Sequence, residues 1–386
     1  MTPQPFSGSY ALSDVQFLLK VIDVPVLDIS EKERRIQQQT AHYSEVLSKE
    51  QPPSEQYLDL YRTALLANGR RMAQDVLKLA SHLNHVHPQG TPIVLVSLAR
   101  AGTPIGVLLK RTLEQFFNRV TAHYSISIIR DRGIDKNAMS YILAKHQDTE
   151  IAFIDGWTGK GVITEELASS IVSLNAEQGL AINPALYVLT DLAGVAGYAA
   201  SFEDYLIPSS ILNASVSGLI SRTVLNERYI GPTEFHGCLY YREFETMDMS
   251  SAFVDAIFSQ VVLLIDTFCY QTANRQHMHG NVHLVADYRI APVSNPQRKG
   301  AVNTANTKFI QQMLKQTGLT NRNYIKPGVG EATRVLLRRV PDCLYLQDAL
   351  AEETRHLVVL ANEKNVPIIV EPTLLYKATA IIKIVD

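Results

Sequence analysis

The chain has 386 residues, of which 46% are hydrophobic and 19% are charged, and its formal net charge at pH 7 is −2. This length allows two domains, and the composition excludes a disordered chain. No apolar run of 18 residues occurs, and the N-terminus lacks the basic and apolar regions of a signal peptide, so we expect a cytoplasmic protein without a membrane partner. Its three cysteines are far apart, as is usual in a reducing compartment.

Residues 1–90 are predicted to form a helical lead-in to a larger domain. Pro52, Pro53 and Ser54 provide a break and an N-cap before a helical stretch that continues to about His85. Apolar residues recur in this stretch at spacings near three and four: Leu58, Tyr61, Leu65, Met72, Val76, Leu79 and Leu83. We therefore expect one face of the helix to pack on the domain that follows.

Residues 91–117 predict a strand, a tight loop and a helix. The run Ile93 to Val96 is typical of a buried parallel strand, and Pro104 occupies the favoured first turn of a helix that continues from Thr103 to Phe117. The loop between them combines small residues with one cation: Ser97, Arg100, Ala101 and Gly102. Because small residues let the main chain approach an anion, this loop is a candidate anion site.

The stretch Ile151 to Glu166 repeats this order. Its apolar run ends in Asp155, and a turn then leads to a helix that continues to about Leu174. The N–H groups of the turn and the positive end of the helix predict a phosphate site formed by Thr158, Gly159, Lys160 and Gly161. Asp155 could hold two ribose hydroxyls or a Mg²⁺ ion. A P-loop of an NTPase is excluded, since the residue after Lys160 is neither Ser nor Thr.

Further strands complete an alternating pattern. A predicted strand from His123 to Ile129 precedes the cationic segment Arg130 to Gly133, which is either a mobile loop over a charged leaving group or an ordinary charged turn. Another strand, Ala185 to Thr190, ends at Asp191, a candidate contact to a base. Alternating strands and helices predict a doubly wound α/β sheet with ligands at the carboxyl ends of its strands.

The two strand–loop–helix units resemble the ligand loops of type I phosphoribosyltransferases. The resemblance implies that Thr158 to Gly161 bind the 5′-phosphate of PRPP and that Ser97 to Gly102 bind its pyrophosphate. It also implies catalytic roles for Asp155 and Arg130, with Mg²⁺ at Asp155. The sequence departs from the family pattern because Gly156 replaces the second acid of the usual pair and the loop is shorter.

The C-terminal segment is strongly basic. Between Pro296 and Pro341 the only acid is Glu331, against nine basic residues: Arg298, Lys299, Lys308, Lys315, Arg322, Lys326, Arg334, Arg338 and Arg339. Such a local excess is typical of a surface that binds nucleic acid. A solvated helix face is the alternative for the three arginines from 334 to 339, since their spacing is near helical.

The sequences IKPGVGEATRVLL and LANEKNVPIIV resemble the RNA-binding fold of ribosomal protein L7Ae and pelota. Gly328, Glu331 and Thr333 match its helix-opening turn, while Gly330 replaces the usual Asn. The resemblance implies RNA contacts from Lys326, Gly328, Gly330, Glu331, Arg334 and Arg338. The loss of the Asn side chain puts recognition of kink-turn RNA in question.

Two other groups of residues carry alternatives. His277, His279 and His283 form H-x-H-x3-H, which is either a zinc site or a polar connecting segment. Cys238, two residues after His236, and Cys269 are each either a nucleophile or a buried apolar residue.

Almost the whole chain resembles a bacterial family found with tellurite-resistance and stress-response genes, whose members are labelled phosphoribosyltransferase or "cysteine protease StiP". We predict a lead-in at 1–90, a phosphoribosyltransferase-like core at 91–292 and a pelota/L7Ae-like domain at 293–386, compatible with a homo-oligomer. The predicted activity is transfer of ribose 5-phosphate from PRPP to a nitrogen of a base-like acceptor, either to make a nucleoside-like stress metabolite or to act on RNA. The alternatives are a non-catalytic PRPP or nucleotide sensor that regulates RNA binding, and a cysteine hydrolase.

Overall fold

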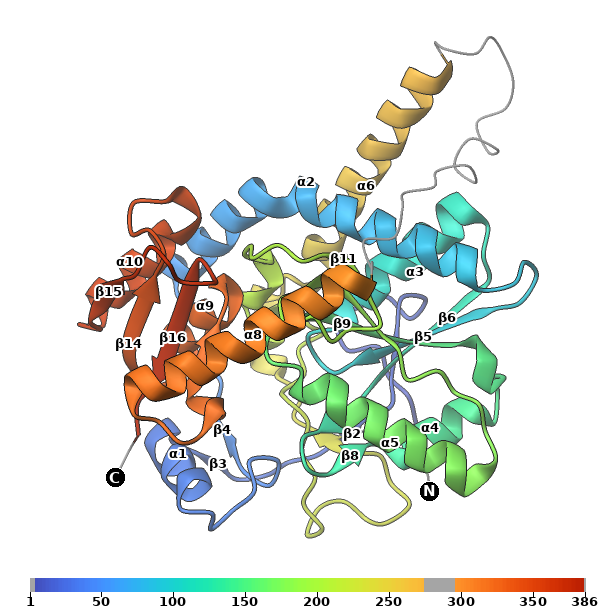
Figure 1. Ribbon diagram of the computed structural model, residues 1–386. Coiled ribbons are helices and arrows are strands. Elements are labelled where there is room, and N and C mark those ends of the chain that lie inside the picture. The colour runs from blue at the N-terminus through green and yellow to red at the C-terminus, as the bar shows by residue number, and fades with distance from the viewer. Residues whose placement is uncertain (1–3, 274–295, 385–386) are drawn as a thin grey trace.

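The computed structural model describes residues 4–273 and 296–384, and a parallel sheet lies at its centre (Figure 1). The order of its six strands is β1-β6-β5-β9-β10-β11, and every neighbouring pair is parallel. The strands are β1 (Gln16–Phe17), β6 (Thr121–Ile126), β5 (Ile93–Leu98), β9 (Ile151–Thr158), β10 (Leu186–Asp191) and β11 (Tyr198–Ser201). The predicted α/β class with a central parallel sheet is confirmed.

Helices cover both faces of this sheet (Figure 1). One face packs on α2 (Glu55–Val86), α3 (Thr103–Phe117) and α6 (Ser250–Ala273). The other packs on α4 (Lys136–Leu143) and α5 (Val162–Gln178). Ser54 caps α2 by accepting a hydrogen bond from the N–H of Tyr57, as its sequence predicts. Two hydrophobic cores result, one on each side of a sheet whose central strands are buried on both faces.

Several smaller elements lie outside the central sheet. Helix α1 (Ile29–Gln37) precedes α2. Two-stranded pairs are β2 (Lys20–Val21) with β12 (Gly237–Cys238), β3 (Val26–Leu27) with β4 (Leu47–Ser48), and β7 (Ile128–Ile129) with β8 (Gly133–Ile134). Short 3-10 helices lie at Asp148–Glu150, Pro208–Ser210, Ala214–Val216, Arg242–Met247, Arg322–Tyr324 and Glu352–Thr354.

The C-terminal part has its own sheet, in the order β13-β16-β14-β15. Its strands are β13 (Ile325–Pro327), β16 (Ala378–Ile382), β14 (Pro341–Leu346) and β15 (Ile368–Val370), and its helices are α8 (Pro296–Thr317), α9 (Val329–Arg338) and α10 (Arg355–Glu363). This sheet stands beside the central one, and α8 crosses between the two parts (Figure 1). The division of the chain at residues 90 and 292 stays a prediction, although β1 shows that the N-terminal segment adds a strand to the central sheet.

Two elements differ from the sequence prediction. Strand β9 continues to Thr158, because β10 pairs beside it as far as Asp191. Asp155 therefore lies inside the strand instead of ending it. The predicted strand from His123 to Ile129 is divided into β6 and the first strand of the β7–β8 hairpin.

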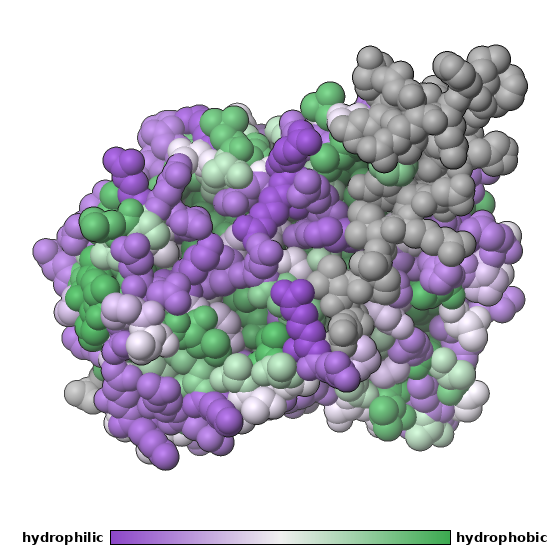
Figure 2. All heavy atoms as spheres, turned by 45° about the horizontal axis from the view of Figure 1, so that its top comes forward, coloured by the Kyte–Doolittle hydropathy of each residue, from purple (hydrophilic) through white to green (hydrophobic). Residues whose placement is uncertain are grey.

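The segment 242–268 is long and apolar enough to cross a membrane, judged by length and composition alone. In the structure α6 packs against α2 and α3 and buries Phe253, Ile257 and Val261. Part of its apolar surface therefore belongs to the core. Hydrophilic side chains predominate on the molecular face shown in Figure 2, with smaller apolar areas between them. The cytoplasmic location stays a prediction.

Candidate functional site

A cleft of about 1310 Å³ lies where the carboxyl ends of β5 and β9 face the C-terminal part. Its wall contains eleven Lys and Arg residues against six Asp and Glu residues, so its field favours anions. The cations are Lys32, Lys49, Arg100, Arg130, Arg132, Lys160, Arg222, Lys326, Arg334, Arg338 and Arg339. This excess of positive charge is local, because the whole chain has a net charge of −2.

The turn after β9 lines the cleft, but its side chains already have partners. Thr158 is buried and donates a hydrogen bond to Asp191. The ammonium of Lys160 donates to the carbonyl oxygens of Arg322 at 2.6 Å and Ile325 at 3.0 Å, which joins the turn to the C-terminal part. Gly161 has φ of 85° at the start of α5, a conformation that favours glycine. Burial, assisted by the charge of Lys326, lowers the pKa of Lys160 to about 6.

Asp155 also lines the cleft. Its Oδ1 accepts a hydrogen bond of 2.8 Å from the N–H of Gly156. Burial raises the pKa of Asp155 to about 7, against the opposing effects of Gly156 and Arg334. A carboxyl with this pKa exchanges a proton near neutral pH, which is a property of general acids and bases. No group of three His, Cys, Asp or Glu side chains that could hold a metal occurs among the described residues, and Mg²⁺ at Asp155 stays a prediction.

The predicted anion loop after β5 is corrected by the structure. Ser97 is fully buried inside β5, where its hydroxyl donates to Gly102 O at 3.1 Å and bonds Nε2 of His123 at 2.7 Å. Neither Ser97 nor Gly102 lines the cleft, whereas Arg100 and Ala101 do. The cause is the length of β5, which continues two residues beyond the predicted Val96.

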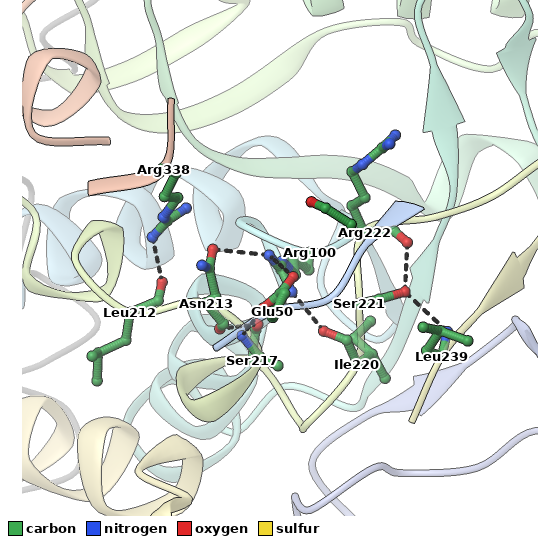
Figure 3. A network of polar contacts seen from close by, with 12 residues as sticks. Glu50, Arg100, Leu212, Asn213, Ser217, Ile220, Ser221, Arg222, Leu239 and Arg338 are labelled. Carbon is green, nitrogen blue, oxygen red and sulfur yellow. Dashed lines mark hydrogen bonds and ion pairs between the residues drawn. The ribbon is translucent and has the colours of Figure 1, made fainter. Parts of the chain in front are cut away.

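Arg100 is held by the chain itself (Figure 3). Its guanidinium pairs with Glu50 at 2.7 Å and donates to Ile220 O at 2.7 Å and to Asn213 Oδ1 at 2.9 Å. These partners come from the segment before α2 and from the loops after β11. Arg100 therefore joins the loop after β5 to these segments of the chain.

Asp191, the predicted base contact, is buried and does not line the cleft. Besides Thr158, it accepts hydrogen bonds from the N–H groups of Val195 at 3.1 Å and Ala196 at 2.9 Å. Its carboxylate closes the turn after β10, so both oxygens are used inside the protein. This corrects the expectation that Asp191 faces a ligand.

Arg130 lies in the hairpin between β7 and β8 and lines the cleft, while its catalytic role stays a prediction. Its Nε is 3.0 Å from Asp131 Oδ2, and its guanidinium carbon lies 5.2 Å from the centre of the Tyr43 ring. The N–H of Arg130 also donates to the Tyr43 hydroxyl at 2.6 Å. The N-terminal segment therefore positions this cation.

The residues predicted to bind RNA do not form one solvated helix face. Glu331 of α9 accepts hydrogen bonds from Trp157 Nε1 at 3.3 Å and from Arg334 at 3.0 Å, and Lys326 lies 3.9 Å from it. Arg338 donates to the carbonyl oxygens of residues 210, 211 and 212. These side chains face the same cleft as the strand ends, so the two sites expected from the sequence are brought together.

Gly328 and Gly330 are the two glycines of the pelota-like turn, and both occupy positions set by the fold. Gly328 has φ of 91°, and a Cβ at this position would lie 2.6 Å from a methyl group of Leu192. Gly330 lies in the first turn of α9. Neither glycine lines the cleft. Sequence reasoning did not identify Lys32, Glu50, Trp157 or Arg222 as members of the site, since no local motif marks them.

The described cysteines lack the surroundings of a catalytic thiol. Cys238 is fully buried in β12, and burial raises its pKa to about 12. Its neighbour His236 bonds the hydroxyl of Ser127 through Nδ1 at 2.8 Å. Burial raises the pKa of Cys343, on β14, to about 11. The side chain of Cys269 and the three histidines 277, 279 and 283 lie outside the described residues.

Comparisons with known proteins find relatives for both parts of the chain. Residues 8–258 match the family described as tellurite-like stress resistance cysteine protease StiP. Residues 304–384 match the PELOTA RNA-binding domain. A protein of Acinetobacter baylyi named cysteine protease StiP is 37% identical over 377 residues, which span 95% of this chain and 90% of the relative.

These matches confirm the predicted likeness to the tellurite-resistance family and to pelota. They overturn the predicted enzyme class. A phosphoribosyltransferase that uses PRPP and magnesium conflicts with a family and a relative that are both named for a cysteine protease. The cysteine-hydrolase alternative is better supported.

Proposed function

Because the chain belongs to the StiP family, we propose that it is a cysteine hydrolase whose substrate enters the basic cleft. The observation that carries the proposal is 37% identity, over 95% of this chain, to a relative named as a cysteine protease. A protease of this class cleaves a peptide bond after attack by a thiolate. The cationic wall favours an acidic peptide segment as substrate.

The proposal sets a requirement on the thiols. A nucleophilic cysteine needs a nearby base or cation that lowers its pKa. Burial has the opposite effect on Cys238 and Cys343, so both are protonated at neutral pH in this conformation. Identification of the nucleophile therefore rests on replacement of each cysteine in turn.

The test is hydrolysis of fluorescein-labelled casein and of a fluorogenic Glu-rich peptide by the full-length chain. Single Cys→Ala variants at positions 238, 269 and 343 are compared with the triple variant, with circular dichroism as the check of folding. We expect one single variant and the triple variant to lose at least ~100-fold of the rate. Full activity in a folded triple variant would exclude a thiol mechanism.

A second function, RNA binding, is favoured by the PELOTA match over residues 304–384 together with the cations of α9 and β13 at the cleft. Phosphates are bound by Lys and Arg in a manner that weakens steeply with salt. Fluorescence anisotropy with a labelled 20-nucleotide RNA tests it. Lys326→Gln and Arg334→Gln should weaken binding, whereas Lys308→Gln, an exposed cation of α8 outside the cleft, should not. Equal effects of all three variants would contradict an RNA path through the cleft.

We propose the finer fold, a sheet like that of type I phosphoribosyltransferases, as an architecture without the transfer chemistry. Support comes from the strand order β6-β5-β9-β10-β11. Along the chain, β6 is added on one side of β5 and β9 on the other, so the topological switch point lies between β5 and β9, where a doubly wound sheet places its ligand. The proposed C-terminal domain, residues 293–386, is tested by its expression alone. Cooperative unfolding of that fragment would support an independent domain.

A further inference from the structure

Three cations from distant parts of the sequence meet at one end of the cleft. Lys32 comes from α1, Arg222 from the loop before β12, and Arg339 from the residue that follows α9. Burial lowers the pKa of Lys32, and repulsion from Arg222 and Arg339 lowers it further, against the attraction of Glu33. Burial likewise lowers the pKa of Arg222 to about 10. The three side chains line one cleft, and Lys32 and Arg339 both lie near Glu33.

Several N–H groups in this cluster have no acceptor. Nη1 of Arg222 and Nε of Arg339 are buried and form no hydrogen bond. One other nitrogen of each guanidinium is used: Arg222 Nη2 donates to Val46 O, and Arg339 Nη2 donates to Glu33 at 2.8 Å. Figure 3 shows the Arg222 guanidinium pointing away from the Glu50–Arg100 pair. A buried donor without an acceptor is unfavourable, so these positions favour a ligand that brings acceptors.

Among the described residues, the contacts of this cluster leave an excess of positive charge. Glu33 is the carboxylate in direct contact with the cluster, 2.8 Å from Arg339 and 3.7 Å from Lys32. Lys32 Nζ otherwise donates to the neutral hydroxyl of Ser48 at 3.0 Å. Three cations against one carboxylate leave two positive charges. A phosphate monoester is close to a dianion at neutral pH and offers three acceptor oxygens to guanidinium groups.

We propose that Lys32, Arg222 and Arg339 form a binding site for the phosphate group of a small phosphorylated molecule. All three side chains line the cleft, and the unpaired N–H groups of the two arginines lie just beneath its surface. A terminal phosphate can approach such a surface closely, whereas a phosphodiester carries chain on both sides and cannot enter as deeply. The same cleft contains Lys326, whose ammonium is 3.9 Å from its carboxylate partner Glu331. The site is independent of any cysteine and goes beyond the proposed hydrolysis.

The test is calorimetric titration of the full-length protein at low ionic strength with inorganic phosphate, with 5′-AMP and with adenosine. We expect phosphate and 5′-AMP to bind with one-to-one stoichiometry and adenosine, which lacks the phosphate, to give no heat. Arg222→Gln and Arg339→Gln should each weaken binding at least tenfold. Arg62→Gln is the matched control, because Arg62 is an exposed arginine on α2 outside the cleft.

Glu33→Gln keeps the proposal testable if an arginine variant does not fold. It removes the carboxylate with little change of shape, and binding of phosphate should become several-fold tighter. The proposal is overturned if phosphate and 5′-AMP do not bind at millimolar concentration, or if the arginine variants bind them as wild type does. It is also overturned if a single-stranded RNA binds through these arginines while the two small probes do not. Loss of hydrolysis in the cysteine variants would leave phosphate binding unchanged, which separates the two proposals.

Discussion

The indole Nε1–H of Trp157 donates a hydrogen bond to Oε1 of Glu331 at 3.3 Å, which joins β9 of the central sheet to α9 of the C-terminal part. The guanidinium of Arg334 lies 5.4 Å from the centre of the same indole ring and donates to the same carboxylate. Trp157 is the one tryptophan of the chain. Its fluorescence therefore reports directly on the contact between the two parts.

Glu331→Gln should shift the emission of Trp157, because the charged partner of both the indole and Arg334 is lost. Burial opposes ionisation of Glu331, but Arg334 and Lys326 overcome it and lower its pKa to about 2. Since an unfolded Glu has a pKa of about 4.3, this carboxylate stabilises the fold fully above that pH and less as the pH falls toward 2. Emission spectra of wild type and Glu331→Gln check the expected shift, and the same spectra recorded from pH 8 to pH 3 check the loss of stability with falling pH. An unchanged spectrum in Glu331→Gln, with Glu227→Gln as exposed control, would contradict the contact.

Asp204 should stabilise the position of α9. Its Oδ1 accepts a hydrogen bond from the N–H of Val329 at 2.8 Å, and its Oδ2 accepts one from the N–H of Lys377 at 3.0 Å. Asp204→Ala leaves these two N–H groups without their acceptor, and we expect it to lower the free energy of unfolding by about 2 kcal/mol. Urea unfolding measures the change.

The same variant should alter the pH dependence of stability. Burial raises the pKa of Asp204 to about 6, above the value of about 3.9 in an unfolded chain. As the pH rises, the unfolded chain loses this proton at a lower pH than the folded protein does. The stabilisation from Asp204 therefore decreases as pH rises from about 4 to 6. The difference between wild type and Asp204→Ala should be larger at pH 4.5 than at pH 8. A larger difference at pH 8 than at pH 4.5 would show that the ionised carboxylate of Asp204 holds the N–H groups of Val329 and Lys377 better than the protonated form does.

Sequence patterns predicted the elements that carry their own local signal. The run before Pro104 and the helix from Thr103 to Phe117 agree with β5 and α3, because buried apolar runs and helix-starting prolines act over a few residues. Contacts across the chain have no such signal. Lys160 looks like a phosphate ligand in sequence, yet its ammonium is bound to carbonyl oxygens 162 and 165 residues away.

Basic residues show the same limit of local patterns. A charge excess between residues 296 and 341 predicts binding of an anion but cannot tell which cations point to solvent. The structure turns Arg338 inward, onto the carbonyl oxygens of Ser210 and Leu212, more than 120 residues earlier. The cleft could not be assembled from the sequence because its walls come from segments that meet only in the folded chain.

Arg338→Met should therefore destabilise the protein strongly. Its Nη2 donates to three carbonyl oxygens in the loop of residues 210–212, and burial lowers its pKa well below the usual value. Removal of a buried cation from such partners costs about 2–4 kcal/mol. Urea unfolding of Arg338→Met, compared with Arg62→Met on the exposed face of α2, gives the measurement. A loss no larger than that of the control would show that the carbonyl oxygens find water instead.

Cys238 should resist thiol reagents in the native protein. Its side chain has no exposed surface, and burial raises its pKa to about 12, so the reactive thiolate is scarce at pH 8. In urea all three cysteines of the chain should react with Ellman's reagent, and in Cys238→Ala only two. The rate and extent of native labelling should be the same in wild type and in Cys238→Ala, because Cys238 reacts only after unfolding. If native labelling instead falls by one thiol in Cys238→Ala, that residue is accessible and reactive at pH 8, and it becomes the first candidate for the nucleophile of the proposed hydrolase.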